Sequence, residues 1–238
     1  MIRIFSDYET LSTAAAEYLV TVGKQAVALR GKFDLVLSGG RTPELTYRNL
    51  ASRFGHERKL WERTRVFWSD ERCVPPDSPQ SNYRLARTAF LDCVSIPPGQ
   101  IHRIAGENPD PERAAEAYEK VFPLSSDLLL LGMGADGHTA SLFPGSPVLD
   151  DMQYRIRAVK APVEPSGRIT ITPRVIANAL EVLVLVSGED KSEAIIRVFS
   201  ETEDMHITPA VLVRKALWFA DHAAGGKTTK TIIKKEED

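Results

Sequence analysis

Residues 128–145 read LLLLGMGADGHTASLFPG, and this stretch decides the fold of the chain. Four consecutive leucines predict a strand buried on both faces, because a parallel strand covered by helices on each side needs no polar alternation. The loop after this strand has glycines at Gly132, Gly134 and Gly137, which let the backbone approach a ligand closely. In open α/β sheets, ligands bind just outside the carboxyl ends of the strands, so this loop is a candidate site.

The same loop also holds an acid–base pair. Asp136 and His138 lie two residues apart, beside the last glycine of the loop. A neutral imidazole is the usual general base near pH 7, and a neighbouring carboxylate can orient its ring. A lone histidine is more often structural than catalytic, but this one follows a glycine loop at a strand end. We therefore expect both residues to be catalytic, and the scattered spacing of the other histidines predicts no metal site.

The glycine spacing invites a second interpretation. The run Gly132–Gly137 matches the dinucleotide-binding pattern G-x-G-x-x-G letter for letter. That pattern requires a helix starting at its third glycine, whereas Pro144, Gly145 and Pro147 leave room for about two turns at most. The motif also follows three earlier strands. The nicotinamide interpretation is therefore the weaker one, and we expect no cofactor.

Strand-like and helix-like segments alternate along the chain. Such alternation predicts an α/β fold of three αβα layers, with a Rossmann-like, mostly parallel sheet that has helices on both faces. The segment 154–158 alternates polar and apolar residues, which is typical of a more exposed or edge strand. The other expected strands are residues 3–6, 33–38, 65–69, 128–131, 181–186 and 216–220.

Three helices have recognisable ends in the sequence. An Ala-rich helix is expected to run to about Arg30. The next one is expected to begin with Thr42 as N-cap and Pro43 in its first turn. Ser187 and Asp190 resemble a capping box that opens a later helix.

Composition excludes several classes of protein. The 238 residues are 43% hydrophobic and 26% charged, as in an ordinary globular domain. A net charge of −2 argues against a nucleic-acid binder, and no apolar run reaches the roughly 18 residues of a membrane span. Two cysteines without a pairing motif and a start unlike a signal peptide indicate a cytoplasmic protein. We expect one domain over 1–224 and a flexible charged tail over 225–238.

Two strand ends besides the glycine loop offer polar groups. At Ser38, Gly39 and Gly40, exposed amides and a helix dipole favour an anion, although a plain tight turn is an equal alternative. Asp70 and Arg72 follow another apolar strand, and the guanidinium can bind a phosphate with two hydrogen bonds. The alternative there is a solvated ion pair among Asp70, Glu71 and Arg72.

A third strand end carries Lys191, in the first turn of an expected helix. A cation is unfavourable against the helix dipole at that place, so a bound anion would explain it. Neutralisation by Glu189 and Asp190 is the alternative. Arg168 is a weaker anion-binding candidate. With no G-x-S-x-G motif and no activated cysteine, a metal-free, non-covalent hydrolytic site fits best.

Taken together, these segments resemble the 6-phosphogluconolactonases, the lactonase branch of the glucosamine/galactosamine-6-phosphate isomerase superfamily. The resemblance covers nearly the whole chain, in the family's order. The matching pieces are LVLSGGRTPELTY (35–47), VFWSDERCVPPDSPQSNYRLA (66–86), LLLLGMGADGHTASLFPGSP (128–147), RITITPRVIANALEVLVLVSGEDKSEAI (168–195) and TPAVLVRKALWFADHAA (208–224).

The related hexosamine-6-phosphate isomerases/deaminases share the Asp-Gly-His core and are the nearest competitor. Their pattern continues toward Phe-Asn-Glu-Pro, with a catalytic Glu, whereas residues 141–145 of this chain read SLFPG. Their strand end tends to read Asp-Glu-Tyr, whereas this chain has Arg72 at the third position. Both differences favour the lactonase. A non-catalytic sugar-phosphate sensor is a third possibility, but 238 residues leave no room for an effector domain.

The resemblance implies hydrolysis of 6-phospho-D-glucono-1,5-lactone to 6-phospho-D-gluconate in the oxidative pentose phosphate pathway. His138 would take a proton from water, and Asp136 would orient the imidazole. The phosphate would be held by the Ser38–Gly40 amides with Arg72 and Lys191. The sequence leaves open which of the cations, Arg41 included, contacts it. We expect a monomer or small homo-oligomer acting on a small molecule.

Overall fold

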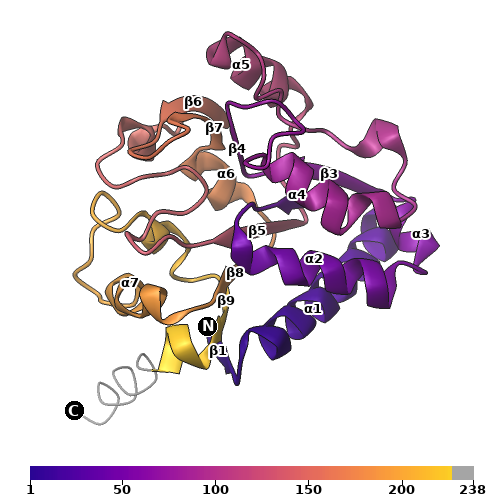
Figure 1. The fold of residues 1–238 in the computed structure, drawn as a ribbon, viewed down its shortest axis with the longest axis horizontal. Helices are drawn as coiled ribbons and strands as arrows, with labels where there is room; N and C mark the ends of the chain where they lie inside the picture. Colours follow the sequence, from indigo (N-terminus) through magenta and orange to yellow (C-terminus); the bar gives the residue numbers. More distant parts are fainter. Residues whose placement is uncertain (227–238) are drawn as a thin grey trace.

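The computed structural model describes residues 1–226, and its largest element is a parallel sheet (Figure 1). Six strands lie in the order β1-β9-β8-β5-β2-β3, and every neighbouring pair runs parallel. The mostly parallel α/β sheet expected from the sequence is therefore confirmed. The strands are β1 (Ile2–Phe5), β2 (Phe33–Leu37), β3 (Thr64–Trp68), β5 (Leu128–Gly132), β8 (Val182–Val186) and β9 (Leu217–Asp221).

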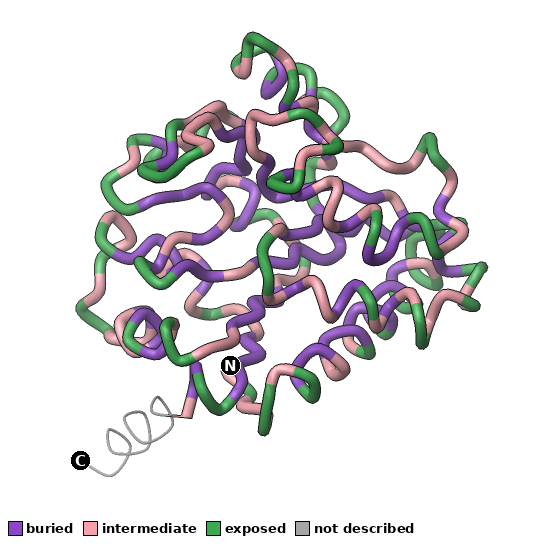
Figure 2. The backbone as a smooth tube through the Cα atoms, viewed as in Figure 1, coloured by how far each residue is buried: buried purple, intermediate pink, exposed green. Residues whose placement is uncertain are grey.

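The inner strands of this sheet form the centre of the core. All five residues of β2 are buried, as are the four leucines of β5 (Figure 2). Trp68 and Trp218, on β3 and β9, are also fully buried. Continuous apolar strands are stable only when both faces are covered, so β5 lies where the leucine run predicts it.

Helices cover the sheet. In Figure 1, α1, α2 and α4 lie together at the right, α7 lies at the lower left, and β1 at the N-terminus lies beside β9. The helices are α1 (Tyr8–Arg30), α2 (Arg41–Phe54), α3 (Arg58–Trp61), α4 (Asn82–Ala89), α5 (Pro111–Val121), α6 (Pro173–Asn178) and α7 (Ser192–Val198). Short 3₁₀ turns occupy Leu91–Cys93, Pro98–Gln100, Pro147–Asp150, Glu189–Lys191 and Pro209–Val213.

Two of the expected helix starts are wrong. Helix α2 begins at Arg41, one residue before the predicted N-cap, and Gly40 occupies the cap position without a side-chain bond. The predicted capping box at Ser187 does not form, because this hydroxyl donates instead to Asp221 Oδ2 at 2.5 Å. Helix α7 consequently starts only at Ser192, after a 3₁₀ turn.

A second, smaller sheet stands apart from the parallel one. It is antiparallel, in the order β4 (Asp70–Arg72), β7 (Gly167–Ile171), β6 (Ile156–Lys160). The expected edge strand at 154–158 corresponds to β6, which lies at the edge but two residues further along. Strands β4 and β7 were not expected, since the strands predicted from the sequence include neither Asp70–Arg72 nor Gly167–Ile171.

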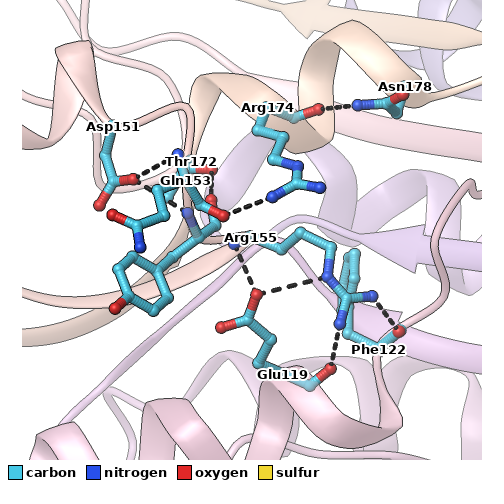
Figure 3. A network of polar contacts seen from close by, with 9 residues as sticks. Glu119, Phe122, Asp151, Gln153, Arg155, Thr172, Arg174 and Asn178 are labelled. Atoms are coloured by element: carbon cyan, nitrogen blue, oxygen red, sulfur yellow. Dashed lines mark hydrogen bonds and ion pairs between the residues drawn. The ribbon is translucent and has the colours of Figure 1, made fainter.

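A polar network joins the small sheet to α5 (Figure 3). Arg155, just before β6, donates to the carbonyl oxygens of Glu119 and Phe122, each at 2.8 Å. Its backbone N–H donates to Glu119 Oε1 at 2.8 Å. These bonds satisfy carbonyl groups at the end of α5 that have no partner within the helix. Arg174 of α6 reaches the same region by donating to the Gln153 carbonyl.

No helix within residues 1–226 is long and apolar enough to cross a membrane. Of the predicted charged tail over 225–238, only Gly225 and Gly226 fall within the described residues.

Candidate active site

The carboxyl ends of β2, β5 and β8 and strands β4 and β7 of the small sheet surround a cavity of about 560 Å³. Its wall contains His138 and every residue that the sequence predicts as substrate-binding. These wall residues are Ser38, Gly39, Gly40, Asp70, Arg72, Arg168 and Lys191. Segments distant in the sequence therefore meet where an α/β sheet is expected to bind a ligand.

His138 and Asp136 form a close polar pair at the site. The ring Nδ1 lies 2.5 Å from Asp136 Oδ1, and the backbone N–H of His138 donates to the same oxygen at 3.1 Å. The side chains are 31% and 44% exposed. Burial raises the pKa of Asp136, but the hydrogen bond and charge of His138 oppose this, and the net pKa lies below the usual value. An ionised Asp136 accepts a hydrogen bond from the Nδ1–H group of His138, which leaves Nε2 as the basic nitrogen of the ring.

Asp136 does not line the cavity of about 560 Å³. It borders a neighbouring cavity of about 720 Å³, and Phe143 belongs to the walls of both. The ring centroid of Phe143 lies 4.6 Å from that of His138. One face of the imidazole is therefore packed against an apolar ring, which restricts its rotation.

The glycine loop does not form a dinucleotide-binding turn. The N–H of Gly134 donates to the His138 carbonyl at 2.8 Å, and the N–H of Gly137 donates to the Gly134 carbonyl at 3.0 Å. After Gly137, residues 138–146 contain no helix. The loop thus folds back on itself around Asp136 and lacks the helix N-terminus that a pyrophosphate requires.

Two tyrosines fix the loop that joins β2 to α2. The Tyr47 hydroxyl accepts from the Ser38 N–H at 3.1 Å and donates to the Ser38 carbonyl at 2.5 Å. The Tyr8 hydroxyl donates to the Arg41 carbonyl at 2.8 Å and accepts from the Leu45 N–H at 3.3 Å. The loop is held from both sides, at the N-terminal end of a 14-residue helix whose dipole favours an anion there.

Asn82 and Ser141 are site residues that the sequence analysis missed. Asn82 is 2% exposed, and its Nδ2 donates to the Asp70 carbonyl at 2.9 Å. Ser141 donates to Asp70 Oδ2 at 2.6 Å, which holds this carboxylate in one orientation. A Cβ at Gly39 would lie 1.9 Å from Asn82 Oδ1, so the closeness of the two residues requires glycine at position 39. In the sequence, Asn82 is recognisable only as a polar residue at the start of a helix that follows the Pro-containing segment 73–81.

Glu71 has a structural role and does not form the ion pair considered above. Its carboxylate accepts from the backbone N–H groups of Arg72, Asn82 and Tyr83, each at 2.8 Å, and from Ser81 Oγ at 2.9 Å. Burial raises the pKa of Glu71 above its usual value even though these donors oppose the shift. Glu71 therefore ties β4 to the beginning of α4 and closes the loop between them.

Arg72 and Arg168 face each other across β4 and β7, as directly paired residues. Arg168 is only 5% exposed, and burial lowers its pKa, with the charge of Arg72 lowering it further. Arg72 donates to the Gln80 carbonyl and Arg168 to the Pro165 carbonyl. Within residues 1–226, neither guanidinium forms an ion pair with a carboxylate. Two opposed cations on a cavity wall are a natural place for a doubly charged anion.

Lys191 lines the same cavity, at the N-cap position of α7. Its Nζ lies 3.1 Å from Asp190 Oδ2, so the alternative of neutralisation by Asp190 is realised in part. Both side chains also line the cavity, together with Arg41. Among the described residues, no group of three or more His, Cys, Asp and Glu side chains is arranged to hold a metal ion.

Comparison with known proteins gives a consistent result. The family described as glucosamine-6-phosphate isomerases/6-phosphogluconolactonase matches residues 6–219. The 6-phosphogluconolactonase of Synechocystis sp. is 39% identical over 215 residues, covering 84% of this chain and 87% of that protein. The solved 6-phosphogluconolactonase of Trypanosoma brucei has a TM-score of 0.84 at 28% identity, covering 95% and 98% of the two chains.

A solved monomeric glucosamine-6-phosphate deaminase also has this fold, with a TM-score of 0.79 at 23% identity, covering 94% of this chain and 98% of its own. Similarity of fold alone therefore does not separate the two activities. The family match, the identity to curated relatives and the residues of the cavity agree with one another. The chain belongs to the glucosamine-6-phosphate isomerase/6-phosphogluconolactonase family.

Proposed function

We propose that this protein is a 6-phosphogluconolactonase, which hydrolyses 6-phospho-D-glucono-1,5-lactone to 6-phospho-D-gluconate in the oxidative pentose phosphate pathway. One observation carries the proposal: a carboxylate-bound imidazole on the wall of a cavity whose other walls present cations. His138 Nδ1 lies 2.5 Å from Asp136, while Arg72, Arg168 and Lys191 line the same cavity as the ring. The curated relatives named 6-phosphogluconolactonase support the substrate class.

In the proposed reaction, His138 acts as general base and then as general acid. Nε2 takes a proton from water as the water oxygen bonds to the lactone carbonyl carbon. When the tetrahedral intermediate collapses, the bond from this carbon to the ring oxygen breaks, and the imidazolium returns its proton to that oxygen. The new carboxylic acid then loses a proton to solvent. Asp136 stabilises the imidazolium between the two steps.

The cations and the backbone of the cavity hold the phosphate away from the reacting carbon. In this proposal Arg72 and Arg168 bind it from the small sheet, and Lys191 with the Ser38–Gly40 turn binds it from the parallel sheet; their position on the cavity wall supports this. Such remote binding energy fixes the lactone carbonyl near His138, so that a bimolecular reaction becomes effectively unimolecular. We assign to Asp70, whose carboxylate is fixed by Ser141, the recognition of sugar hydroxyls.

The deaminase alternative is less well supported. It requires a further carboxylate after the Asp-Gly-His core, and the residue that packs on the His138 ring is Phe143. The carboxylates on the cavity wall are Asp70, bound by Ser141, and Asp190, paired with Lys191. We include in the proposal a cytoplasmic location, with which the free thiols Cys73 and Cys93 are consistent, and a monomer or small homo-oligomer.

Hydrolysis of freshly prepared 6-phosphogluconolactone, measured against its spontaneous rate, tests the proposal. We expect rapid turnover by the wild-type protein and a turnover lowered by roughly 10²–10⁴-fold in His138→Gln. Ammonia release from glucosamine 6-phosphate is measured in parallel. Turnover of glucosamine 6-phosphate without lactone hydrolysis would establish the deaminase instead, and binding of 6-phosphogluconate without either turnover would indicate a sensor.

A further inference from the structure

The motif Thr208-Pro209-Ala210 has no place in the cavity described above. None of its three residues lines that cavity. Thr208 and Ala210 are nevertheless completely buried, and the turn that they form lies directly behind the loop carrying Asp136 and His138. Thr208 contacts this loop without lining the cavity, so any effect of Thr208 on the reaction is transmitted through the loop.

Two contacts join this turn to Gly137. The N–H of Ala210 donates to the Gly137 carbonyl at 2.8 Å. A Cβ added at Gly137 would lie 2.6 Å from Thr208 Cγ2, so the threonine methyl occupies the space beside the glycine. Gly137 has φ of 88°, a conformation that other L-residues rarely adopt. The turn therefore packs against Gly137 and donates a hydrogen bond to it, and Gly137 lies between Asp136 and His138.

The Thr208 hydroxyl is also engaged. It donates to the Glu203 carboxylate and accepts from Arg197 Nε at 3.4 Å. Arg197 Nη2 in turn donates to the Ala135 carbonyl at 3.4 Å. Because threonine has few allowed rotamers, hydrogen bonds to the hydroxyl also fix the direction of the methyl. The methyl therefore presents a fixed surface to Gly137.

The segment before the turn holds the far end of the same loop. The His206 carbonyl accepts from the Gly145 N–H at 2.8 Å. Residues 203–210 therefore contact the catalytic loop at Gly137 and at Gly145, on either side of the helix-free stretch 138–144. None of residues 203–210 lines the cavity.

We propose that Thr208 is a positioning residue, which holds Gly137 in its left-handed conformation and thereby keeps Asp136 aligned with His138. The proposal rests on the function proposed above. Asp136 Oδ1 meets both the backbone N–H and Nδ1 of His138, and this double contact requires the backbone conformation at Gly137. Displacing a reacting group by about 1 Å can cost roughly 100-fold in rate.

A second-site suppressor experiment tests the contact directly. Gly137→Ala places a methyl against Thr208 Cγ2, and we expect kcat to fall by roughly 100-fold with little change in KM. Thr208→Ser keeps the hydroxyl but removes Cγ2, and alone should lower kcat about threefold to tenfold. In the double variant the clash is removed, so kcat should exceed that of Gly137→Ala by about tenfold.

Gly31→Ala is the matched control. Gly31 also has a positive φ, of 73°, but has no atom within 4 Å of an added Cβ and ends α1 far from the cavity. It should lose stability from backbone strain and keep the wild-type kcat. Thr208→Ser should not suppress its stability loss.

The Nδ1–H proton signal of His138 in the NMR spectrum gives a readout that needs no activity. We expect a hydrogen-bonded signal in the wild type, its loss in Gly137→Ala and its return in the double variant, with His138→Gln assigning it. A double variant as slow as Gly137→Ala, with no returned signal, overturns the proposal. If Gly137→Ala fails to fold, an unchanged kcat and signal in Thr208→Ser overturn it. An inactive wild type with this signal pattern refutes the proposed function alone.

Discussion

The parallel sheet and the small antiparallel sheet bring different groups to one cavity. The parallel sheet supplies His138, whose ring is bound by Asp136, the Ser38–Gly40 turn and Lys191, all on loops that leave buried strands. The small sheet supplies the facing arginines, Arg72 and Arg168, on the strands themselves. Proton transfer is thus assigned to a loop of the parallel sheet, and much of the anion recognition to the small sheet.

This division has a physical reason. A general base must be held within a few tenths of an ångström, and β5, buried between β2 and β8, is a rigid support for the loop that carries it. Guanidinium groups bind a phosphate through charge and several donors, so their positions need to be less precise than that of a general base. Substitutions in the loops of the parallel sheet that carry the general base should therefore lower kcat, whereas substitutions of the arginines on the small sheet should raise KM.

Removing the general base should have the largest effect. We expect His138→Gln to lower kcat by roughly 10²–10⁴-fold, while KM changes little, because the imidazole acts on the proton in the transition state. Steady-state hydrolysis of fresh lactone measures both parameters. His56→Gln is the control, since that side chain is 73% exposed and should leave both unchanged. A comparable loss of kcat in the control would show that the effect is not specific to the site.

Removing a cation from the small sheet should affect binding instead. We expect Arg168→Met to raise KM by roughly 10–100-fold with kcat within about threefold, since hydrogen bonds to charged groups contribute about 1.5–3 kcal/mol. The exposed Arg63, which contributes no side chain to the cavity, provides the control variant Arg63→Met. A large loss of kcat in Arg168→Met would mean that the small sheet takes part in the chemistry, and the contrast between the sheets would fail.

The small sheet also depends on its connection to α5. Arg155→Ala removes the donors to the carbonyls of Glu119 and Phe122, and we expect a loss of about 1–3 kcal/mol in unfolding free energy. Urea denaturation measures this loss. Arg53→Ala breaks an exposed ion pair with Glu17 and should cost less than about 1 kcal/mol. Equal losses in both variants would contradict the role assigned to the network.

The smallest effect concerns pH and the opposite end of the parallel sheet. Burial raises the pKa of Asp34, but hydrogen bonds from Arg65 and Lys32 outweigh it and hold the pKa below the usual 3.8. Because the folded pKa is depressed, this stabilisation is present above pH 3.8 and is lost as the pH falls through the folded value. The stability gap between wild type and Asp34→Asn, measured with urea, should shrink below pH 3.8. A gap independent of pH would refute the linkage, and kcat at neutral pH should not change.

The parallel sheet was predictable because its signals are local. The leucines of β5 and the Asp-Gly-His core indicate a buried strand and the loop that we propose as catalytic within 18 consecutive residues. The small sheet was not predictable in the same way. Strand β4 has only three residues, two of them acidic, and it pairs with β7, which lies far along the chain. No local periodicity marks such a strand, so Asp70–Arg72 reads as a loop.

Asn82 and Thr208 escaped prediction for a related reason. Each acts through a contact with a glycine remote in sequence, Gly39 for Asn82 and Gly137 for Thr208. The glycines are visible in the sequence, but the neighbour that requires them is visible only in three dimensions. Arg72 and Lys191 could be predicted to line the cavity because charge at a strand end is itself a signal, and their binding of phosphate is a proposal.

The contact between Gly39 and Asn82 couples the residues that are allowed at these two positions, which belong to segments attached to different sheets. Position 39 belongs to the parallel sheet's loop and position 82 begins α4, which Glu71 ties to the small sheet. A side chain at 39 can be accommodated only if residue 82 becomes smaller, and Asp70 then loses a donor. In a library randomised at both positions and selected for activity, the two identities should co-vary, and sequences with a larger residue at 39 should be rare.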